Sequence, residues 1–396
     1  MVNFDYLYNK DYYGEKLYTN YLYGKKLHFK IIENGTVLPY KPPISSAWGF
    51  GGIIDAKRNF VNGSFVVNDG LRAYTPTEEV KFVPANVIYL GMFVGVWGHL
   101  LTDQLKHTWF LNSEVYKENF KNCPIVYNPW IGWGERGISK DLLKLLKILE
   151  VDTDKLIPIT APTKFQNIIF PDESFFNVKD KGNFFTNEHL ELIDRIRNFA
   201  KKNFTELSQK KFYFFHGKGE IGEERLAEYF KTKGYSVVVG GNMPLEEQLN
   251  ILANCTDFAS TIGSCALNMI FTPDNTNVIL FPRYYAGELY SLPMSQIHNL
   301  NVNYIDSALS LFQKNAFGPF CYIISKQLKN FFGDEAADEY TEEDFITFLK
   351  YVKNSISQGL KENPELRKYY SAVLPEFLNQ IKKREDLTKQ FGIAIQ

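Results

Sequence analysis

Short apolar runs alternate with segments of helical periodicity through the second half of the chain. The runs that predict strands are KFYFFH (211–216), YSVVVG (235–240), DFASTI (257–262), NVILF (277–281) and NVNYI (301–305). Helices are predicted between them at 222–233, 244–254 and 264–271, and another over 187–204. Buried strands that alternate with helices through short loops are typical of a doubly wound, Rossmann-like sheet.

The first half of the chain shows the same alternation less regularly. After a region of short strands and loops, NVIYLGMFV (86–94) predicts a strand, residues 98–112 a helix and PIVYN (124–128) a second strand. Residues 140–150 predict an amphipathic helix with a leucine-rich face, and two further apolar runs follow it. We therefore expect an α/β domain with a parallel or mixed sheet.

The length of 396 residues suffices for two domains, each with its own core. The polar segment NVKDKGN (177–183) is the best candidate for a boundary, so we expect one domain over 1–180 and a second over 181–333. The charged segment 334–396 predicts helices. The expected architecture is two Rossmann-like α/β domains that face a cleft, with a C-terminal helical tail.

Composition narrows the classes of function. A hydrophobic share of 45% and a charged share of 22% are those of a soluble globular protein, and the net charge of −1 argues against a nucleic-acid binder. The four cysteines lack CxxC spacing, as expected for reduced thiols in the cytoplasm. Acidic residues interrupt the N-terminal segment where a signal peptide needs an apolar core, and no run approaches a membrane span, so we expect a cytoplasmic protein.

Small residues occupy the point where the strand 257–262 meets the next predicted helix. Gly263 permits a tight turn, and Ser264, Cys265 and Ala266 keep bulk away from the backbone N–H groups at the helix start. Unpaired N–H groups at a helix N-terminus suit a phosphate or diphosphate. The alternative is that the small residues only let the helix pack closely on the strand.

A second candidate is the loop after the strand 211–216. His216 and Lys218 lie there, at the same predicted edge of the sheet as Gly263, and Lys218 could neutralise a diphosphate. An ordinary solvated lysine is the alternative. Arg283, in FPRYYAGE after the strand 277–281, is a further candidate for contact with a nucleotide, with a surface loop as its alternative.

The segment WGHLLTDQLKHTWFL (97–111) offers a candidate acid/base group. In a regular helix, His99, Asp103 and His107 are spaced four apart and share one face. Asp103 could accept a proton from a hydroxyl, with His99 orienting the group or acting as the base itself. A metal site and a merely polar helix face are the alternatives.

Together, these stretches resemble the glycosyltransferases of family 61, the DUF563-type group that contains many enzymes of bacterial capsular-polysaccharide synthesis. The GHxxxDxLxxxxxL segment of that family is matched at Gly98, His99, Asp103, Leu105 and Leu111. Its second-domain motifs are matched at Gly234, Glu247, Gln248, Gly263, Asn268 and Phe271. Ile262 stands where the family has a histidine, and His216-Gly217-Lys218 replaces its arginines.

The resemblance implies a GT-B fold and inverting, metal-independent transfer from a nucleotide sugar. It makes 1–180 the acceptor domain and 181–333 the domain that binds the donor, with a UDP-sugar as the expected co-substrate and no cofactor. The expected catalytic residues are Asp103, as base, and His99. The residues expected to bind the donor are Lys218, His216, Gly263, Ser264, Cys265, Asn268, Glu247, Gln248 and Arg283.

The predicted function is therefore glycosyl transfer to a hydroxyl of a glycan or polysaccharide acceptor in surface-polysaccharide synthesis. Peripheral association with a membrane-bound biosynthetic assembly at the inner face of the membrane belongs to the same expectation. Two alternatives stay open. One is a non-catalytic carbohydrate-binding or scaffold relative, and the other is a different nucleotide-sugar enzyme such as an epimerase.

Overall fold

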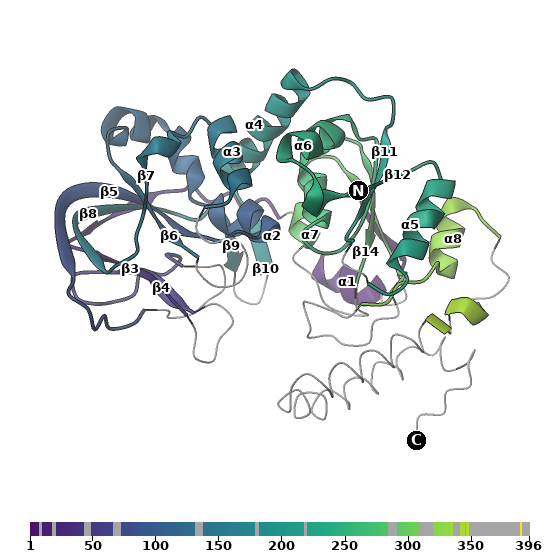
Figure 1. Cartoon of the computed structure of the whole chain (residues 1–396), viewed down its shortest axis with the longest axis horizontal. Helices are drawn as coiled ribbons and strands as arrows, with labels where there is room; N and C mark the ends of the chain where they lie inside the picture. Colours follow the sequence, from purple (N-terminus) through teal and green to yellow (C-terminus); the bar gives the residue numbers. More distant parts are fainter. Residues whose placement is uncertain are drawn as a thin grey trace. The chain divides into compact units, whose positions relative to one another are not determined.

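The computed structural model describes most of the chain up to residue 335 and little of it beyond. The described residues are 1–7, 10–17, 21–42, 49–65, 73–130, 138–178, 182–217, 220–283, 291–308, 320–335, 341–344, 346–347 and 389. The chain divides into two compact units, and Figure 1 shows their helices and strands. Unit 1 comprises Met1–Thr19 and Thr205–Gln396, and unit 2 comprises Asn20–Phe204.

Unit 1 contains a six-stranded sheet in which every pair of neighbouring strands is parallel. Its strands are β1 (Val2–Tyr6), β11 (Lys211–Phe215), β12 (Ser236–Val239), β13 (Asp257–Thr261), β14 (Asn277–Phe281) and β15 (Asn301–Ile305). Their order across the sheet is β1-β15-β14-β13-β11-β12, so the direction of winding reverses between β11 and β13. This reversal is the switch point at which open α/β sheets bind ligands.

The register of this sheet follows from where each apolar run begins. Lys211 pairs with Asp257, Asp257 with Asn277, and Asn277 with Asn301, so the polar first residues line up at the amino edge. The apolar residues that follow are mostly buried, as expected for strands covered on both faces. The carboxyl ends of the strands therefore lie side by side at the opposite edge.

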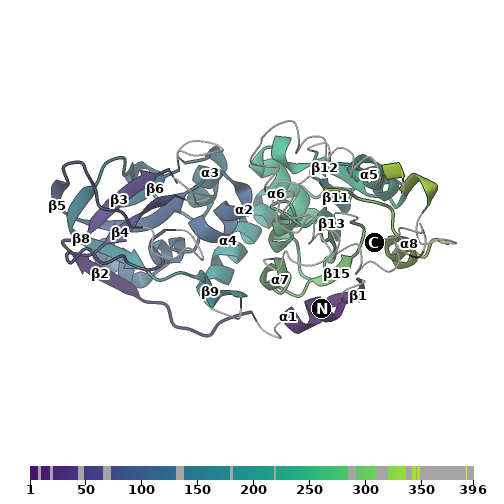
Figure 2. The ribbon, with the colours of Figure 1, turned by 90° about the horizontal axis from the view of Figure 1, so that it is seen from below.

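Helices cover both faces of the parallel sheet. Figure 2 shows α5 (Glu223–Thr232) and α8 (Lys326–Phe332) on one face and α6 (Leu245–Asn254) and α7 (Ser291–Met294) on the other. Phe230 of α5 and Leu328 of α8 belong to one apolar cluster with Tyr213 of β11. The helix α1 (Lys10–Lys16) follows β1, and the short helical turn η5 (Gly240–Asn242) follows β12.

Unit 2 contains a mixed sheet of seven strands. They are β2 (Phe29–Glu33), β3 (Thr36–Lys41), β4 (Phe50–Ile54), β5 (Lys81–Phe93), β6 (Ile125–Pro129), β7 (Leu156–Pro158) and β8 (Thr163–Pro171). The four strands β8-β5-β6-β7 are mutually parallel, whereas β2, β3 and β4 pair antiparallel with their neighbours. The parallel part reverses its winding between β5 and β8, which gives unit 2 a switch point of its own.

The helices of unit 2 connect these strands. The regular helices are α3 (Lys140–Ile148) and α4 (Asn187–Asn203), and η3 (Tyr116–Phe120) and η4 (Thr153–Lys155) are shorter turns. Ser139 caps α3 by accepting the Leu142 N–H at 3.1 Å, and Leu142, Leu145 and Leu146 are buried, as the leucine pattern predicts.

The segment 98–112 is not the single helix that its periodicity predicts. It consists of α2 (Trp97–His99), a π-helical turn η1 (Leu100–Gln104) and, after a non-helical turn, the 3₁₀ helix η2 (Thr108–Asn112). A π turn shifts the side chains that follow it to another side of the helix axis. The expectation that three polar residues of this segment share one face is therefore wrong.

The expected domain boundary also differs from the structure. Asn177 and Val178 end β9 (Phe175–Val178), and Gly182 and Asn183 begin β10 (Gly182–Phe185), which pairs antiparallel with β9. The polar composition of such a connection resembles that of a linker between domains. The change of unit comes after α4, at Phe204, and the N-terminal strand β1 belongs to unit 1. Both units are α/β, as predicted.

The expected tail over 334–396 lies largely outside the described residues. Within it, 342–344 and 346–347 are helical, and Asp344 is buried and forms an ion pair with Arg225 of α5 at 2.8 Å. In the described part of the chain, none of the helices has the length and apolar character needed to cross a membrane.

Candidate functional site

The carboxyl ends of β11 and β13 bring several of the predicted residues to one edge of unit 1. His216 and Gly217 follow β11, and Ile262, Gly263 and Ser264 follow β13. Because β11 and β13 are neighbours on either side of the switch point, these residues begin the two loops that flank it. Lys218, the predicted cation of the first loop, lies outside the described residues.

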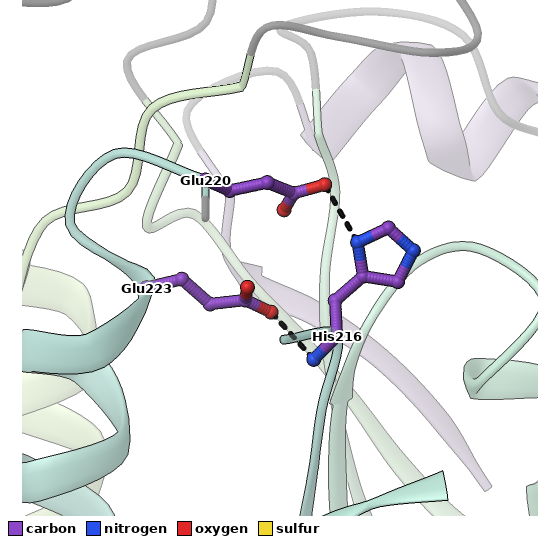
Figure 3. A group of neighbouring side chains, drawn as sticks. All are labelled: His216, Glu220 and Glu223. Carbon is purple, nitrogen blue, oxygen red and sulfur yellow. Dashed lines mark hydrogen bonds and ion pairs between the residues drawn. The ribbon is translucent and has the colours of Figure 1, made fainter. Parts of the chain in front are cut away.

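Three side chains after β11 form a compact cluster, which Figure 3 shows. The Nδ1 nitrogen of His216 lies 2.7 Å from Oε1 of Glu220. The backbone N–H of His216 donates to Oε1 of Glu223 at 2.7 Å, and that of Gly217 donates to its Oε2 at 3.3 Å. The loop amides that could receive a phosphate are therefore occupied by a carboxylate of the protein.

The backbone of Gly222 places Glu223 in this cluster. Gly222 is the N-cap of α5 and has a φ of +82°, and a Cβ atom there would lie 2.0 Å from the carbonyl oxygen of Tyr322. Only glycine combines that conformation with so close an approach. The turn directs Glu223, which is fully buried, into the first turn of α5 and toward the loop after β11.

The surroundings of Glu223 disfavour its charged form. Burial raises the pKa of Glu223, and the negative charge of Glu220 raises it further, while the hydrogen bond from the His216 amide opposes the shift. Tyr213 lies close to both glutamates, and its pKa is raised by burial first and then by Glu223 and Glu220. Both glutamates thus bear on the same buried part of this edge.

Gly263 and Arg283 meet at the neighbouring part of the same edge. A Cβ on Gly263 would lie 3.5 Å from Cζ of Arg283, and the guanidinium lies 4.5 Å from the centre of the Phe320 ring. The sequence analysis named both residues as candidates for contact with the donor, and the structure brings them together. Their contact puts a cation beside the turn after β13.

The helix after this turn is not the one predicted. Residues Ala266–Phe271 form the six-residue 3₁₀ helix η6, which ends where Thr272 bonds to the Met269 carbonyl and Pro273 prevents continuation. A helix this short has only a small dipole. The expectation of a longer helix from Ser264 is therefore wrong, whereas phosphate binding at Gly263, Ser264 and Cys265 stays a prediction, with Ser264 and Cys265 partly exposed.

The other residues predicted to bind the donor do not join this cluster. Gln248 is buried and donates both of its hydrogen bonds to the loop after β12, at the Gly240 and Met243 carbonyls, each at 2.9 Å. Asn268 is buried within η6, and Glu247 is exposed on α6. The burial of Gln248 and Asn268 fits structural roles, whereas Glu247 lies on the surface of unit 1.

In unit 2, His99 and Asp103 form the predicted pair. Nδ1 of His99 lies 2.7 Å from Oδ2 of Asp103, which also accepts the Thr102 hydroxyl at 3.3 Å. The side chain of Asp103 is 6% exposed and that of His99 30%. The pair lies on α2 and η1, directly after the carboxyl end of β5.

His107 does not belong to this pair. It is fully buried, its Nδ1 lies 2.9 Å from the Pro171 carbonyl oxygen, and its ring packs against Phe170. Burial lowers its pKa to about 3, and the nearby charge of Lys106 lowers it further. His107 fixes the helical segment onto the end of β8, so its role is structural.

A small cavity opens beside the end of β8 in unit 2. It has a volume of about 180 Å³, and its charged lining residues are Lys25, Lys30, Asp172 and Glu173. None of the predicted site residues lines it. The volume is below the range of about 300–1,000 Å³ typical of ligand pockets.

Comparisons with known proteins neither support nor contradict the resemblance to family 61. No protein-family model matches the chain, and no curated protein matches it in sequence. Membership of family 61 therefore remains a prediction from the motifs.

Glu220 and Glu223 were not predicted from the sequence to belong to a site. The available signal was a histidine directly after a buried strand, with an acidic residue four positions later and another at the start of the next helix. Phosphate binding predicts basic residues in this loop, so the two glutamates had no place in that prediction.

Proposed function

We propose that the protein is a glycosyltransferase that moves a sugar from a nucleotide-sugar donor to a hydroxyl of a glycan acceptor. A UDP-sugar as donor, and a cytoplasmic location at the inner face of the membrane, belong to the same proposal. The observation that carries it is the hydrogen-bonded pair of His99 and Asp103.

A histidine that is hydrogen-bonded to a carboxylate can act as a general base. A carboxylate bonded to Nδ1 holds the proton on that nitrogen, so Nε2 becomes the basic position of the ring. Because His99 is the more exposed of the two side chains, we assign it as the base and Asp103 as the residue that orients it. This reverses the order expected from the sequence, in which Asp103 was the base.

The donor side of the proposal depends on unit 1. A parallel α/β sheet binds nucleotides outside the carboxyl ends of its strands at the switch point. Arg283 lies there beside Gly263, and a guanidinium can form paired hydrogen bonds to phosphate oxygens. The protein's task in inverting transfer is to deprotonate the acceptor and to stabilise charge on the departing nucleotide diphosphate.

A panel of nucleotide sugars tests the proposal. The full chain is incubated with each donor, and the unfolding midpoint and the products are measured. Stabilisation by a nucleotide sugar together with release of the nucleotide diphosphate supports the transferase. If no nucleotide sugar changes the unfolding midpoint or reacts, the proposal is contradicted and a carbohydrate-binding relative is favoured. If the sugar nucleotide is isomerised but stays intact, the proposal is contradicted and an epimerase is favoured.

A further inference from the structure

The cluster of His216, Glu220 and Glu223 has the features of a cation site. We propose that these three side chains bind a divalent metal ion that accepts both imidazole and carboxylate ligands, with Mn²⁺ and Zn²⁺ as the ions to test. The resemblance to family 61 implies transfer without a metal, so the proposed ion is a departure from that expectation.

The first argument is geometric. One ligand atom from each of the three residues lies within 4.8 Å of the others. Zinc bonds to nitrogen and oxygen are about 2.0–2.2 Å long, so two ligands of one ion are at most about 4.4 Å apart. Small side-chain rotations therefore suffice to bring the three atoms around one ion.

The second argument is an unsatisfied buried oxygen. The Glu220 side chain is only 9% exposed, and its Oε2 atom has no hydrogen-bond partner among the described residues. In Figure 3 this oxygen lies on the side that faces Glu223. Buried carboxylate oxygens without partners are costly, and an ion between the two carboxylates would satisfy this one.

The third argument is charge. In the described part of the chain, no lysine or arginine forms an ion pair with Glu220 or Glu223, and His216 is the residue that pairs with Glu220. The fully buried hydroxyl of Tyr213 also lacks a hydrogen-bond partner in that part and interacts electrostatically with both glutamates. A divalent ion would compensate both negative charges at once.

The ligand types indicate which ions fit. Imidazole suits zinc and other transition ions, whereas carboxylates also suit manganese. A His-Glu-Glu set therefore favours Mn²⁺ or Zn²⁺ over Mg²⁺ or Ca²⁺, which prefer oxygen ligands alone. The Nδ1 of His216 and Oε1 of Glu220 lie 2.7 Å apart, and a bound ion would take the place of the hydrogen bond between them.

The rival explanation is that Glu223 holds a proton and donates it to Glu220. Direct binding measurements on the chelator-treated, dialysed full chain separate the two. We expect isothermal titration calorimetry with MnCl₂ or ZnCl₂ alone to show one ion per chain, with a rise in the unfolding midpoint. No nucleotide is present, so the outcome is independent of the proposed glycosyl transfer.

Variants locate the ion. Glu220→Gln and Glu223→Gln keep the size of the side chain and its ability to accept a hydrogen bond, and each is expected to weaken binding by more than about tenfold. Glu224→Gln, on the exposed side of the same helical turn, is the matched control and should bind as the natural chain does. Circular dichroism checks that each variant is folded. If one of the two glutamate variants, Glu220→Gln or Glu223→Gln, does not fold, the other alone provides the test.

Two results would overturn the proposal. One is the absence of binding by either ion at millimolar concentration, which would favour a proton on Glu223. The other is binding that Glu220→Gln and Glu223→Gln leave unchanged, or that Glu224→Gln weakens equally.

Discussion

The Nδ1 nitrogen of His99 lies 2.7 Å from Oδ2 of Asp103, across one turn of a helix that widens into a π turn at Leu100. A histidine held in this way has a defined tautomer and a defined ring orientation. On the proposed function, Asp103 therefore positions the ring and His99 transfers the proton.

Replacement of Asp103 tests this assignment. We expect Asp103→Asn to lower kcat by about 10²–10⁴-fold, because an amide cannot hold the tautomer or stabilise the charged ring. KM for the donor should stay near its natural value, and Asp103→Glu should restore part of kcat. Steady-state kinetics measure both constants, with Asp154→Asn in an exposed turn as control. A parallel change in KM, or full activity in Asp103→Asn, would remove Asp103 from the mechanism.

Arg283 is expected to contribute to nucleotide binding. Its guanidinium lies beside Gly263 at the carboxyl edge of the parallel sheet, where it can bond to phosphate oxygens. Arg283→Gln should weaken the binding of a nucleoside diphosphate by about tenfold or more in a calorimetric titration, which corresponds to about 1.4 kcal/mol. Arg197→Gln on α4 serves as the control. Equal affinity in the natural chain and Arg283→Gln would place the phosphate elsewhere.

Gly222 and Gly234 form a natural pair for testing the turn that positions Glu223. Both have positive φ angles, +82° and +80°, but a Cβ would meet the Tyr322 backbone at Gly222 and nothing within 4 Å at Gly234. We expect Gly222→Ala to lower the free energy of unfolding by about 1–3 kcal/mol more than Gly234→Ala, since only the former adds a clash to the backbone strain. Urea denaturation measures the difference. Equal losses would mean that the turn tolerates a side chain.

Two buried histidines of unit 2 make its stability depend on pH. Burial lowers the pKa of His107 to about 3 and that of His189 to about 4, whereas an unfolded histidine titrates near 6.5. Below about pH 6.5 the unfolded chain therefore binds protons that the folded chain does not, and stability falls as the pH falls. Each histidine accounts for a loss of about 2 kcal/mol by pH 5.

Denaturation at pH 7 and pH 5 measures this dependence. His189→Gln should reduce the loss, because it removes one of the two groups while keeping a polar partner for Ser174. His28→Gln, at an exposed position, should not. If His189→Gln loses as much free energy of unfolding as the natural chain between pH 7 and pH 5, the buried ring of His189 does not cause the pH dependence.

Local patterns predicted the regular parts of the fold. The apolar runs of β11 to β15 and the helices α4, α5 and α6 were recognisable because each buries a continuous stripe or face. The pairing of β1 with β15 was not, since it joins residues about 300 positions apart and depends on contacts that periodicity does not encode. The π turn at Leu100 was missed for a similar reason, because tertiary contacts of His107 with the end of β8 override the helical spacing.

The candidate sites were predicted in part. The four-residue spacing of His99 and Asp103 on a helix was enough to pair them, and the edge of the parallel sheet was enough to bring Gly263 near Arg283. The cluster around Glu223 depends on the backbone of Gly222 and on its approach to Tyr322, a distant part of the chain. Such a contact has no local signature, so the acidic character of this edge emerges only from the fold.

Acceptor-dependent release of a nucleoside diphosphate is the most direct test of the central claim that the protein transfers sugar from a nucleotide sugar. The natural chain and the His99→Gln variant are incubated with a panel of nucleotide sugars and an oligosaccharide acceptor, and mass spectrometry follows the elongated product. The account predicts product and diphosphate in equal amounts from the natural chain, and a loss of at least about 10²-fold in His99→Gln. No product from any donor, or equal product from both chains, would contradict it.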